Sequence, residues 1–262
     1  MRTFALKFNN VMQKAVVIIP MYNERENAAA IIDAVLGLEK PFDVLVIDDN
    51  SPDGTAAIVK DKIAASPGRV HIIARPGKLG LGTAYITGFK WALAHGYDII
   101  CEMDADFSHN PLDLLKLRDE VESGRADVAV GSRYVTGVNV VNWPMGRVLM
   151  SYFASKYVRI VTGIPVHDTT AGFVCYSAEV LRTLDLDKVK FKGYAFQIEM
   201  KFTAYKYGFR VAEVPIIFVN RVLGTSKMSG GIFGEAVFGV IRLKWNSLFR
   251  KYPARSQKSV KN

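Results

Sequence analysis

Short apolar runs alternate with longer amphipathic segments along the first half of the chain. The apolar runs are rich in Val and Ile and cover residues 15–20, 43–48, 70–74, 98–103 and 127–131. Runs of this length are typical of strands whose two faces are both buried. The segments between them have helical periodicity and cover residues 26–38, 54–65, 82–96 and 111–121. This alternation predicts an α/β fold, a mainly parallel sheet with helices on both faces.

The starts and faces of several helices follow from individual residues. Asn23 and Glu26 have the spacing of a capping box, which predicts that the first helix begins there. Amphipathic helices are also predicted over 147–161 and 232–249. In the former, every fourth residue is polar, and the prediction is one polar stripe made of Arg147, Ser151, Ser155 and Arg159.

Polar residues follow the end of every predicted strand. They are Tyr22, Asn23, Glu24, Asp48, Asp49, Arg75, Lys78, Asp104, Asp106, Ser132 and Arg133. In open parallel sheets ligands bind outside the carboxyl ends of the strands. The spacing of Asp104 and Asp106 lets both carboxylates reach one hard divalent cation. Taken alone, the same pair is also compatible with a solvated turn before Pro111.

Composition and charge bound the partners. A chain of 262 residues, half of them hydrophobic, can bury one substantial core. The net charge of +9 favours an anionic partner, either lipid headgroups or a phosphorylated substrate. No basic helix with interleaved aromatics is present, so no nucleic-acid partner is expected. Cys101 and Cys175 lie in apolar runs and are predicted to be free core thiols in a reducing compartment.

Several familiar sites are excluded by their missing residues. The turn after the first strand reads PMYNERE, without the glycines of a dinucleotide fold, and GLGTAY puts Tyr85 where the third glycine belongs. Gly77 and Lys78 are followed by Leu79, so a phosphate-binding P-loop is absent. No His-Glu-x-x-His zinc sequence occurs, no apolar run reaches about 18 residues, and the start is too short for a signal peptide.

The motifs PMYNERENA, VIDDNSPDGT, RPGKLGLGTAYITGFK, MDADFSHNP, GSRY, DTTAGFVCYS, KGYAFQIEM and EVPIIFVNRVLGTSKM occur in this order between Ala15 and Met228. This series resembles the dolichol-phosphate mannose synthases, which are inverting GT-A-type family 2 glycosyltransferases. The resemblance implies an N-terminal arm over 1–13, a GT-A catalytic domain over 14–228, an amphipathic helix over 229–250 and a basic tail over 251–262.

The resemblance also implies a donor site for GDP-mannose. Pro20, Tyr22, Glu24 and Asp49 match positions that hold the guanosine, and further donor contacts are expected from Lys78, Ala105, Arg221 and Lys227. Asp104 and Asp106 match the pair that binds Mg²⁺ or Mn²⁺. A third metal ligand is left open, and Ser108, directly or through a water, is the candidate.

The acceptor site implied by the resemblance holds the phosphate of dolichyl or polyprenyl phosphate on Arg133, Arg147 and Ser151. Asp104, Asp106 and Arg133 are the expected catalytic residues. The expected products are polyprenyl β-mannosyl phosphate and GDP. Two alternatives stay open, a glucosyltransferase that uses UDP-glucose and a non-catalytic nucleotide-sugar-binding subunit. Roles for Asp168 and Glu199 are not assigned, and His109 and His167 are expected to make local hydrogen bonds only.

Membrane contact is expected at the surface, because the sequence resembles the short form of the family without transmembrane helices. The apolar faces of 143–161 and 232–249 carry basic residues and fit interfacial helices on anionic lipid. Packing of the last helix on the enzyme's own sheet or on a partner membrane subunit is the alternative. The expected location is cytoplasmic, peripheral on the cytoplasmic face of a membrane.

Overall fold

A computed structural model describes residues 13–193, 195–221 and 232–253, without the side chains of residues 232–237. Its main feature is a seven-stranded sheet with the order β3-β2-β1-β4-β7-β5-β8. The strands are β1 (Ala15–Met21), β2 (Asp43–Asp48), β3 (Val70–Ala74), β4 (Ile99–Glu102), β5 (Val128–Ser132), β7 (Val174–Ser177) and β8 (Val211–Pro215). A second sheet pairs β6 (Val140–Val141) with β9 (Phe218–Val219).

The predicted parallel strands are all present. β1, β2, β4 and β5 are buried as their continuous apolar sequences require, whereas β3, at the edge of the sheet, is only partly buried. β1 pairs in parallel with β2 on one side and with β4 on the other. The sequence did not identify β7, which runs antiparallel between β4 and β5. This insertion makes the sheet mixed but leaves it mainly parallel, so the predicted fold class is confirmed.

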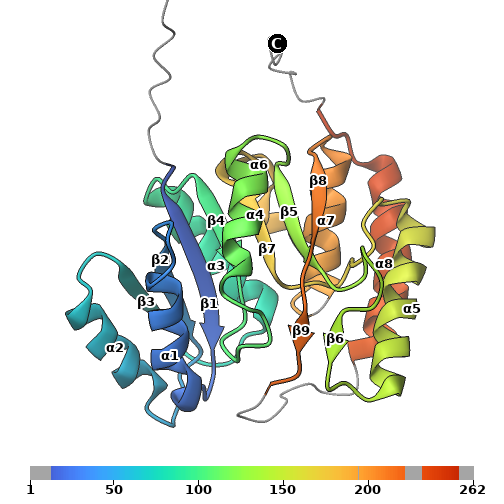
Figure 1. Ribbon diagram of the computed structural model, residues 1–262. Coiled ribbons are helices and arrows are strands. Elements are labelled where there is room, and N and C mark those ends of the chain that lie inside the picture. The colour runs from blue at the N-terminus through green and yellow to red at the C-terminus, as the bar shows by residue number, and fades with distance from the viewer. Residues whose placement is uncertain (1–12, 194, 222–231, 254–262) are drawn as a thin grey trace, which may run out of the picture.

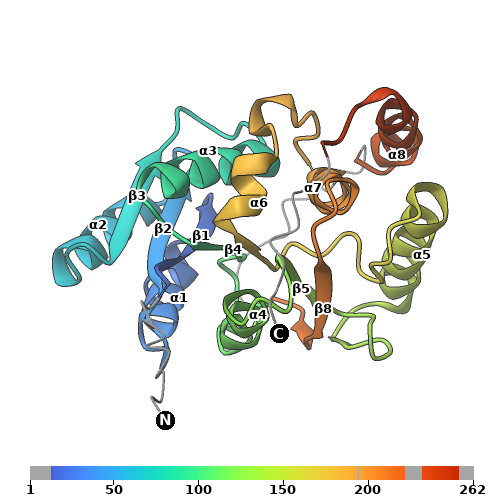
Figure 2. The ribbon, with the colours of Figure 1, turned by 90° about the horizontal axis from the view of Figure 1, so that it is seen from above.

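Helices cover both faces of the sheet (Figure 2). They are α1 (Arg25–Leu36), α2 (Thr55–Ala65), α3 (Leu81–Ala94), α4 (Asp113–Glu122), α5 (Met145–Thr162), α6 (Ala178–Thr183), α7 (Ala195–Lys206) and α8 (Ile232–Phe249), with a short 3₁₀ helix at Leu186–Lys188. Buried side chains of α1, α2 and α4 pack on one face. Those of α3, α6 and α7 pack on the other.

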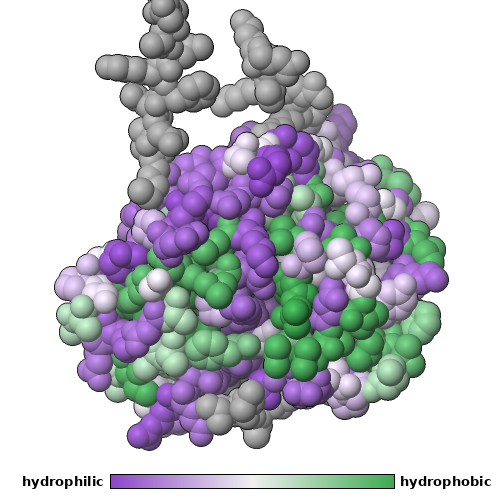
Figure 3. All heavy atoms as spheres, viewed as in Figure 1, coloured by the Kyte–Doolittle hydropathy of each residue, from purple (hydrophilic) through white to green (hydrophobic). Residues whose placement is uncertain are grey.

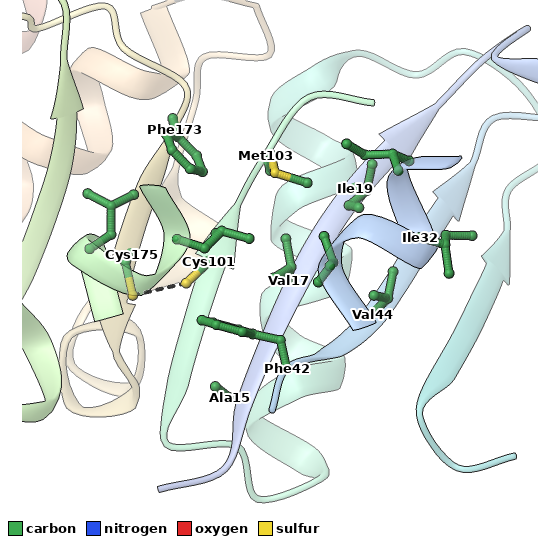
Figure 4. Close-up of a cluster of buried hydrophobic side chains, with 14 of the residues drawn as sticks. Ala15, Val17, Ile19, Ile32, Phe42, Val44, Cys101, Met103, Phe173 and Cys175 are labelled. Carbon is green, nitrogen blue, oxygen red and sulfur yellow. Dashed lines mark hydrogen bonds between the residues drawn. The ribbon is translucent and has the colours of Figure 1, made fainter. Parts of the chain in front are cut away.

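Figure 4 shows the core between α1 and the first of these faces, where Val17, Ile19, Ile32 and Val44 meet. Cys101 and Cys175 lie in the same core, and both are free and buried as predicted. They are direct neighbours across β4 and β7, with 3.0 Å between the two Sγ atoms.

The predicted capping box at Asn23 is wrong. α1 begins after Glu24, and no side-chain hydrogen bond caps it. Asn23 has a φ of 53°, in the left-handed region that Asn tolerates, and its N–H donates to Ser51 Oγ at 3.0 Å. Asn23 therefore belongs to the turn that ends β1, and the loop after β2 holds this turn in place.

α5 and α8 stand beyond α7 at one end of the molecule (Figure 2). Val158 of α5, Ile198 of α7 and Val240 of α8 form a small separate core there. No helix in the described part of the chain has the length and hydropathy needed to cross a membrane. Both helices keep large apolar side chains exposed, including Ile160 and Trp245.

Candidate active site

The predicted metal-binding pair and part of the predicted donor site lie at the carboxyl ends of β1 and β4. These neighbouring strands mark the point where the chain order of the sheet reverses, because β2 and β3 lie on one side of β1 and β4 on the other. Ligands of doubly wound sheets bind at this kind of switch point. The turn of residues 22–24 follows β1, and the Asp-x-Asp sequence follows β4.

The Asp-x-Asp loop is a compact turn organised by Asp106. Its Oδ1 accepts hydrogen bonds from the hydroxyl and the backbone N–H of Ser108, at 2.6 and 3.1 Å. Phe107, between them, has a φ of 57°, so this turn holds a bulky residue in the left-handed region. Asp106 and Ser108 are both buried. Ser108 thus fixes the orientation of the Asp106 carboxylate.

Asp104 has a different environment. Within the described residues its carboxylate oxygens make no hydrogen bond, and its backbone N–H points to His109 Nδ1 at a long 3.5 Å. Burial, followed by the negative charge of Asp106, raises the pKa of Asp104 to about 7. A carboxylate that makes no hydrogen bond within the described residues and lies beside a second negative charge is a suitable position for a cation.

Arg221 supplies positive charge from the segment after β9. Its Nη2 lies 3.1 Å from Asp106 Oδ2. The backbone fixes this approach, because Val219 N–H donates to Ser108 O at 3.2 Å and Phe218 pairs with Val140 in the small sheet. The predicted donor contact Lys227 and the glycines near it lie outside the described residues.

The donor-side residues are held by the loops after β1, β2 and β3. Lys78 Nζ lies 5.4 Å from the centre of the Tyr22 ring, so these two predicted contacts face one another. Glu24 Oε2 accepts a hydrogen bond from Asn27 Nδ2 at 3.0 Å, and its carboxylate is close enough to oppose ionisation of Asp104. These contacts bring together polar groups from three loops, those after β1, β3 and β4, at one edge of the sheet.

Asp49 is not an isolated acceptor. Arg75 binds it through two hydrogen bonds, from Nε to Oδ1 at 2.6 Å and from Nη2 to Oδ2 at 2.7 Å. Both residues are buried, and Arg75 also donates to Thr83 Oγ1 at 2.7 Å. Arg75 therefore fixes Asp49 against α3, and a nucleoside could use only the lone pairs that remain.

Arg133, predicted for the acceptor phosphate, forms a buried bidentate pair with Asp168. Its Nε and Nη2 each lie 2.6 Å from a carboxylate oxygen of Asp168. Burial disfavours the ionised form of Asp168, but the charge and hydrogen bonds of Arg133 hold its pKa below the ordinary value. Three aromatic rings surround the guanidinium, those of Tyr134, Trp143 and Phe218.

Arg147 and Ser151 lie beside this pair on α5. Arg147 stacks on Trp143, with 3.9 Å from Cζ to the ring centre, and donates to Asn220 Oδ1 at 3.1 Å. Ser151 Oγ accepts a hydrogen bond from the Tyr134 hydroxyl at 2.7 Å. Asn220 directly precedes Arg221, so one short segment links the acceptor-side Arg147 to Asp106.

The predicted single polar stripe on α5 is wrong. Ser155 is buried, while Arg147 and Arg159 are not. Four residues make slightly more than one helical turn, so each step of four rotates the side chain by about 40°. Over the three steps the side chains therefore change faces: Arg147 lies on the acceptor side, Ser155 on the packing face, and Arg159 is again partly exposed.

The described residues contain no cluster of three or more His, Cys, Asp or Glu side chains suited to a metal. Asp104 and Asp106 nevertheless fit a divalent cation. They offer hard oxygen ligands, and Asp104 has no hydrogen-bonding partner among the described residues to be displaced. Ser108 donates its proton to Asp106, so it orients a ligand in this structure.

Several important residues were missed from the sequence. Ser51, Asp53 and Thr55 accept hydrogen bonds from the backbone N–H groups of residues 23–25 and so clamp the turn after β1. The sequence indicated only a turn there. Buried Lys201 donates to the carbonyl oxygens of Thr169 and Ala171, which fixes the loop carrying Asp168. The sequence signal that could have identified Lys201 was a charged residue inside a mainly apolar helical segment.

The fold matches solved glycosyltransferase structures. Glucosyl-3-phosphoglycerate synthase from Mycobacterium tuberculosis, in complex with Mn²⁺, UDP and glucosyl-3-phosphoglycerate, superposes with a TM-score of 0.64 at 17% identity, covering 92% of this chain and 82% of that one. The predicted GT-A fold is therefore confirmed. Residues 16–185 match the model of Glycosyl transferase family 2. The chain belongs to this family.

Two relatives are similar over nearly the whole chain. Polyprenol monophosphomannose synthase of Mycolicibacterium smegmatis is 49% identical over 228 residues, which cover 87% of this chain and 86% of the relative. Undecaprenyl-phosphate mannosyltransferase of Micrococcus luteus is 46% identical over 239 residues, covering 90% and 97%.

Proposed function

We propose that this glycosyltransferase moves mannose from GDP-mannose to the phosphate of a dolichyl or other polyprenyl phosphate. The products are polyprenyl β-mannosyl phosphate and GDP. The observation that carries the proposal is the 49% and 46% identity to two enzymes named for mannosyl transfer to polyprenol or undecaprenyl phosphate. The grouping of carboxylates and arginines at one edge of the sheet supports it.

The reaction needs positioning and charge neutralisation more than acid–base chemistry. A phosphate monoester loses its second proton near pH 6, so at neutral pH an oxygen of the acceptor attacks C1 of mannose largely as a dianion. The C1–O bond to the diphosphate breaks, and GDP leaves with the electron pair. Attack from the opposite side inverts the α-linked donor to a β-linked product. No protein base is required.

The donor side has the groups that this step requires. Lys78 and Tyr22 face each other near the turn after β1, and Glu24 provides a carboxylate acceptor for base or ribose donors. Arg221 lies where it can neutralise negative charge next to Asp106. Asp104 and Asp106 would hold Mg²⁺ or Mn²⁺. Such an ion neutralises the charge that develops on the leaving diphosphate.

The same fold has been solved with these ions, since the Mycobacterium tuberculosis enzyme was crystallised with Mn²⁺ and UDP and with Mg²⁺ and UDP. In the present chain the support for a metal is the Asp104 carboxylate, which makes no hydrogen bond within the described residues and lies beside Asp106. Metal dependence is therefore part of the proposal.

The acceptor side combines Arg147 with the Arg133–Asp168 pair. Asp168 neutralises much of the charge of Arg133, and its two hydrogen bonds also fix the orientation of the guanidinium plane. Arg147 donates to the neutral side chain of Asn220 and stacks on Trp143, and its guanidinium fork suits a phosphate, so it is the principal candidate for binding the acceptor phosphate. Ser151 and the Tyr134 hydroxyl offer neutral hydrogen bonds next to it.

A long isoprenoid substrate resides in a membrane, so the enzyme must act at the membrane surface. Its exposed apolar side chains are suited to contact with lipid. In Figure 3, hydrophobic residues gather over the part of the molecule where Figure 1 places β6, β9 and α5. Exposed apolar residues there and on α8 are Val138, Val141, Met145, Leu149, Phe153, Ile160, Ile217, Phe238, Ile241, Trp245, Leu248 and Phe249. We propose peripheral association with the cytoplasmic face, directly or through a membrane subunit.

A transfer assay tests the function. The purified protein is incubated with Mg²⁺ or Mn²⁺, a short polyprenyl phosphate and radiolabelled GDP-mannose or UDP-glucose in parallel, and label extracted into organic solvent is counted. We expect metal-dependent label from GDP-mannose only. Asp104→Asn should reduce it about 10²-fold or more. Asp61→Asn, an exposed carboxylate on α2, is the matched control and should transfer normally.

The other outcomes are equally informative. Label from UDP-glucose alone would reassign the donor to the glucosyl alternative. Absence of transfer from both donors, with nucleotide binding retained, would overturn the enzymatic proposal in favour of a binding subunit. Transfer that persists after chelation of divalent ions would remove the metal from the mechanism.

A further inference from the structure

A hollow of about 90 Å³ lies between α5 and the segments on either side of it in the chain. Tyr134, Tyr152, Lys156, Arg159 and His167 line it. This volume is several times the ~10–15 Å³ that one water requires. Tyr134 also contacts the acceptor side through its hydroxyl, but Tyr152, Lys156, Arg159 and His167 belong to none of the proposed donor, metal or acceptor sets. The transfer reaction therefore does not account for most of the lining.

The lining carries an excess of positive charge. Lys156 and Arg159 lie one turn apart on α5, and neither makes an ion pair with a described residue. The carboxylate near the hollow, Glu213, is buried and already used. It accepts hydrogen bonds from the backbone N–H groups of His167 and Asp168 and contacts His167 Nδ1 at 2.7 Å. The charge that faces the hollow is therefore cationic.

The donors around the hollow match a phosphate group. Arg159 and Lys156 supply charge-assisted donors, and the Tyr152 hydroxyl and the imidazole of His167 add two more groups. The contact with Glu213 fixes the His167 ring, so its second nitrogen lies on the edge away from Glu213. The Tyr134 hydroxyl donates a hydrogen bond to Ser151 Oγ, so the hollow adjoins the acceptor-side residues through Tyr134.

The surroundings favour a lipid source for this phosphate. On a helix, residues 152, 156 and 159 occupy one flank, and residues 149, 153 and 160 occupy the adjacent strip. That strip consists of Leu149, Phe153 and Ile160, and Ile160 is 75% exposed. A free anion needs no apolar neighbours, whereas a phospholipid presents acyl chains directly beside its headgroup.

We propose that this hollow is a binding site for the phosphate headgroup of an anionic membrane phospholipid, with Lys156 and Arg159 as its principal ligands. The acyl chains of the bound lipid lie along the apolar strip of α5. The site adjoins the proposed acceptor site but uses different charged residues, and it orients the enzyme on the bilayer next to Arg147.

Vesicle sedimentation of the purified full chain tests the site without any nucleotide sugar. The pocket variant is Lys156→Gln with Arg159→Gln. The control is Lys60→Gln with Arg182→Gln, which removes one exposed Lys and one exposed Arg from α2 and α6. With vesicles of phosphatidylglycerol and phosphatidylcholine, the pocket variant should lose on the order of tenfold to thirtyfold in partitioning, and the control less than twofold.

Vesicles of phosphatidylcholine alone should show no difference between the two variants. Equal losses in both variants with phosphatidylglycerol would overturn the site, because net charge would then explain binding. The chain has only four histidines, so few imidazole signals overlap in an NMR spectrum and those of His167 can be followed. The lipid assignment would be overturned if inorganic phosphate shifted the NMR signals of His167 and the pocket variant still bound the vesicles as the wild type does.

A last measurement separates this inference from the proposed function. Transfer to a short acceptor without vesicles should be the same in the pocket variant and in the wild type. Loss of transfer there would overturn the separation from the acceptor site. Failure of the transfer assay in the wild type leaves the vesicle result unaffected. Thermal unfolding of each variant confirms that it is folded.

Discussion

Arg221 Nη2 lies 3.1 Å from Oδ2 of Asp106, the second carboxylate of the Asp-x-Asp sequence. Two segments more than a hundred residues apart are thereby joined, the loop after β4 and the segment after β9. The arginine neutralises Asp106 before any ligand arrives, and the same positive charge can later serve a diphosphate. Under the proposed function, Arg221 would therefore compete with a cation before the donor binds and assist the leaving group afterwards.

Replacement of Arg221 by Gln should change these two properties in opposite directions. Affinity for Mn²⁺ without nucleotide should rise about threefold to tenfold, because a partly exposed competing cation is removed. The transfer rate should fall at least about tenfold, because a charge that stabilises the leaving diphosphate is lost. Mn²⁺ binding is measured by electron paramagnetic resonance and transfer by the extraction assay.

Arg210→Gln is the control for that variant, because Arg210 also pairs with an aspartate. Its Nε lies 3.2 Å from Oδ2 of Asp127, and the two residues directly precede β8 and β5. It should leave metal affinity and transfer unchanged. If Mn²⁺ affinity fell together with transfer in Arg221→Gln, the competition argument would be wrong.

The Arg133–Asp168 pair predicts a stability loss with a defined pH dependence. Asp168→Asn leaves a buried guanidinium without its charge partner and should destabilise the protein by about 3–5 kcal/mol. The folded pKa of Asp168 is depressed, and the unfolded one is near 3.9, so the pair's contribution is complete above about pH 4. It is lost as the pH falls through the lower folded value.

The urea unfolding free energy of Asp168→Asn should therefore show the same loss at pH 5 and pH 7. Asp187→Asn, in an exposed pair with Lys90, is the control and should change stability by less than about 0.5 kcal/mol. A loss in Asp168→Asn that differs strongly between pH 5 and pH 7 would mean that another group titrates with this pair.

Local sequence patterns predicted most of the central fold. The strands β1, β2, β4 and β5 appeared as apolar runs because both of their faces are buried, a condition that leaves a strong local signal. The edge strand β3 is only partly buried but has an apolar sequence as well. β7 has only four residues, and the sequence of such a short apolar run does not indicate which strands β7 pairs with or in which direction it runs. The mixed character of the sheet depends on long-range pairing, so the local pattern could not reveal it.

The candidate site shows the same limit. Acidic residues after strands were visible because strand ends share one edge of a parallel sheet. The partners that fix them were not visible, since Asp168 is 35 residues from Arg133 and Arg75 is 26 residues from Asp49. Those pairs exist only once the loops are folded. The resemblance to a known family supplied candidates such as Arg221, but not the contact with Asp106.

Buried Glu102 predicts a second pH effect, of opposite sign to that of Asp168. Burial, the largest cause, raises its pKa to about 8, although Gln197 donates a hydrogen bond to its Oε2 at 2.6 Å. The folded state then holds a proton that the unfolded state releases above about pH 4.5. Stability from this group is complete below pH 4.5 and decreases as the pH rises towards 8.

Glu102→Gln should remove this slope, because an amide stays neutral at every pH. Between pH 5.5 and pH 8 the wild type should lose on the order of 2–3 kcal/mol more unfolding free energy than the variant. Urea titrations at the two pH values measure this, with exposed Glu26→Gln as the control that keeps the wild-type slope. Parallel slopes in wild type and Glu102→Gln would show that Glu102 is ionised throughout.

The two helical glycines Gly88 and Gly146 predict opposite stability changes for the same substitution. A Cβ on Gly88 would lie 2.7 Å from Ile18 Cγ2, in the core where α3 packs on β1. Gly88→Ala should therefore force apart a helix and a strand and cost about 1–3 kcal/mol. Gly146 has no atom within 4 Å of its Cβ position, so Gly146→Ala should gain up to about 0.5–1 kcal/mol from helix propensity. Urea unfolding of both variants measures the difference, and a loss of similar size in both would show that α3 does not rest on Ile18 as closely as the structure indicates.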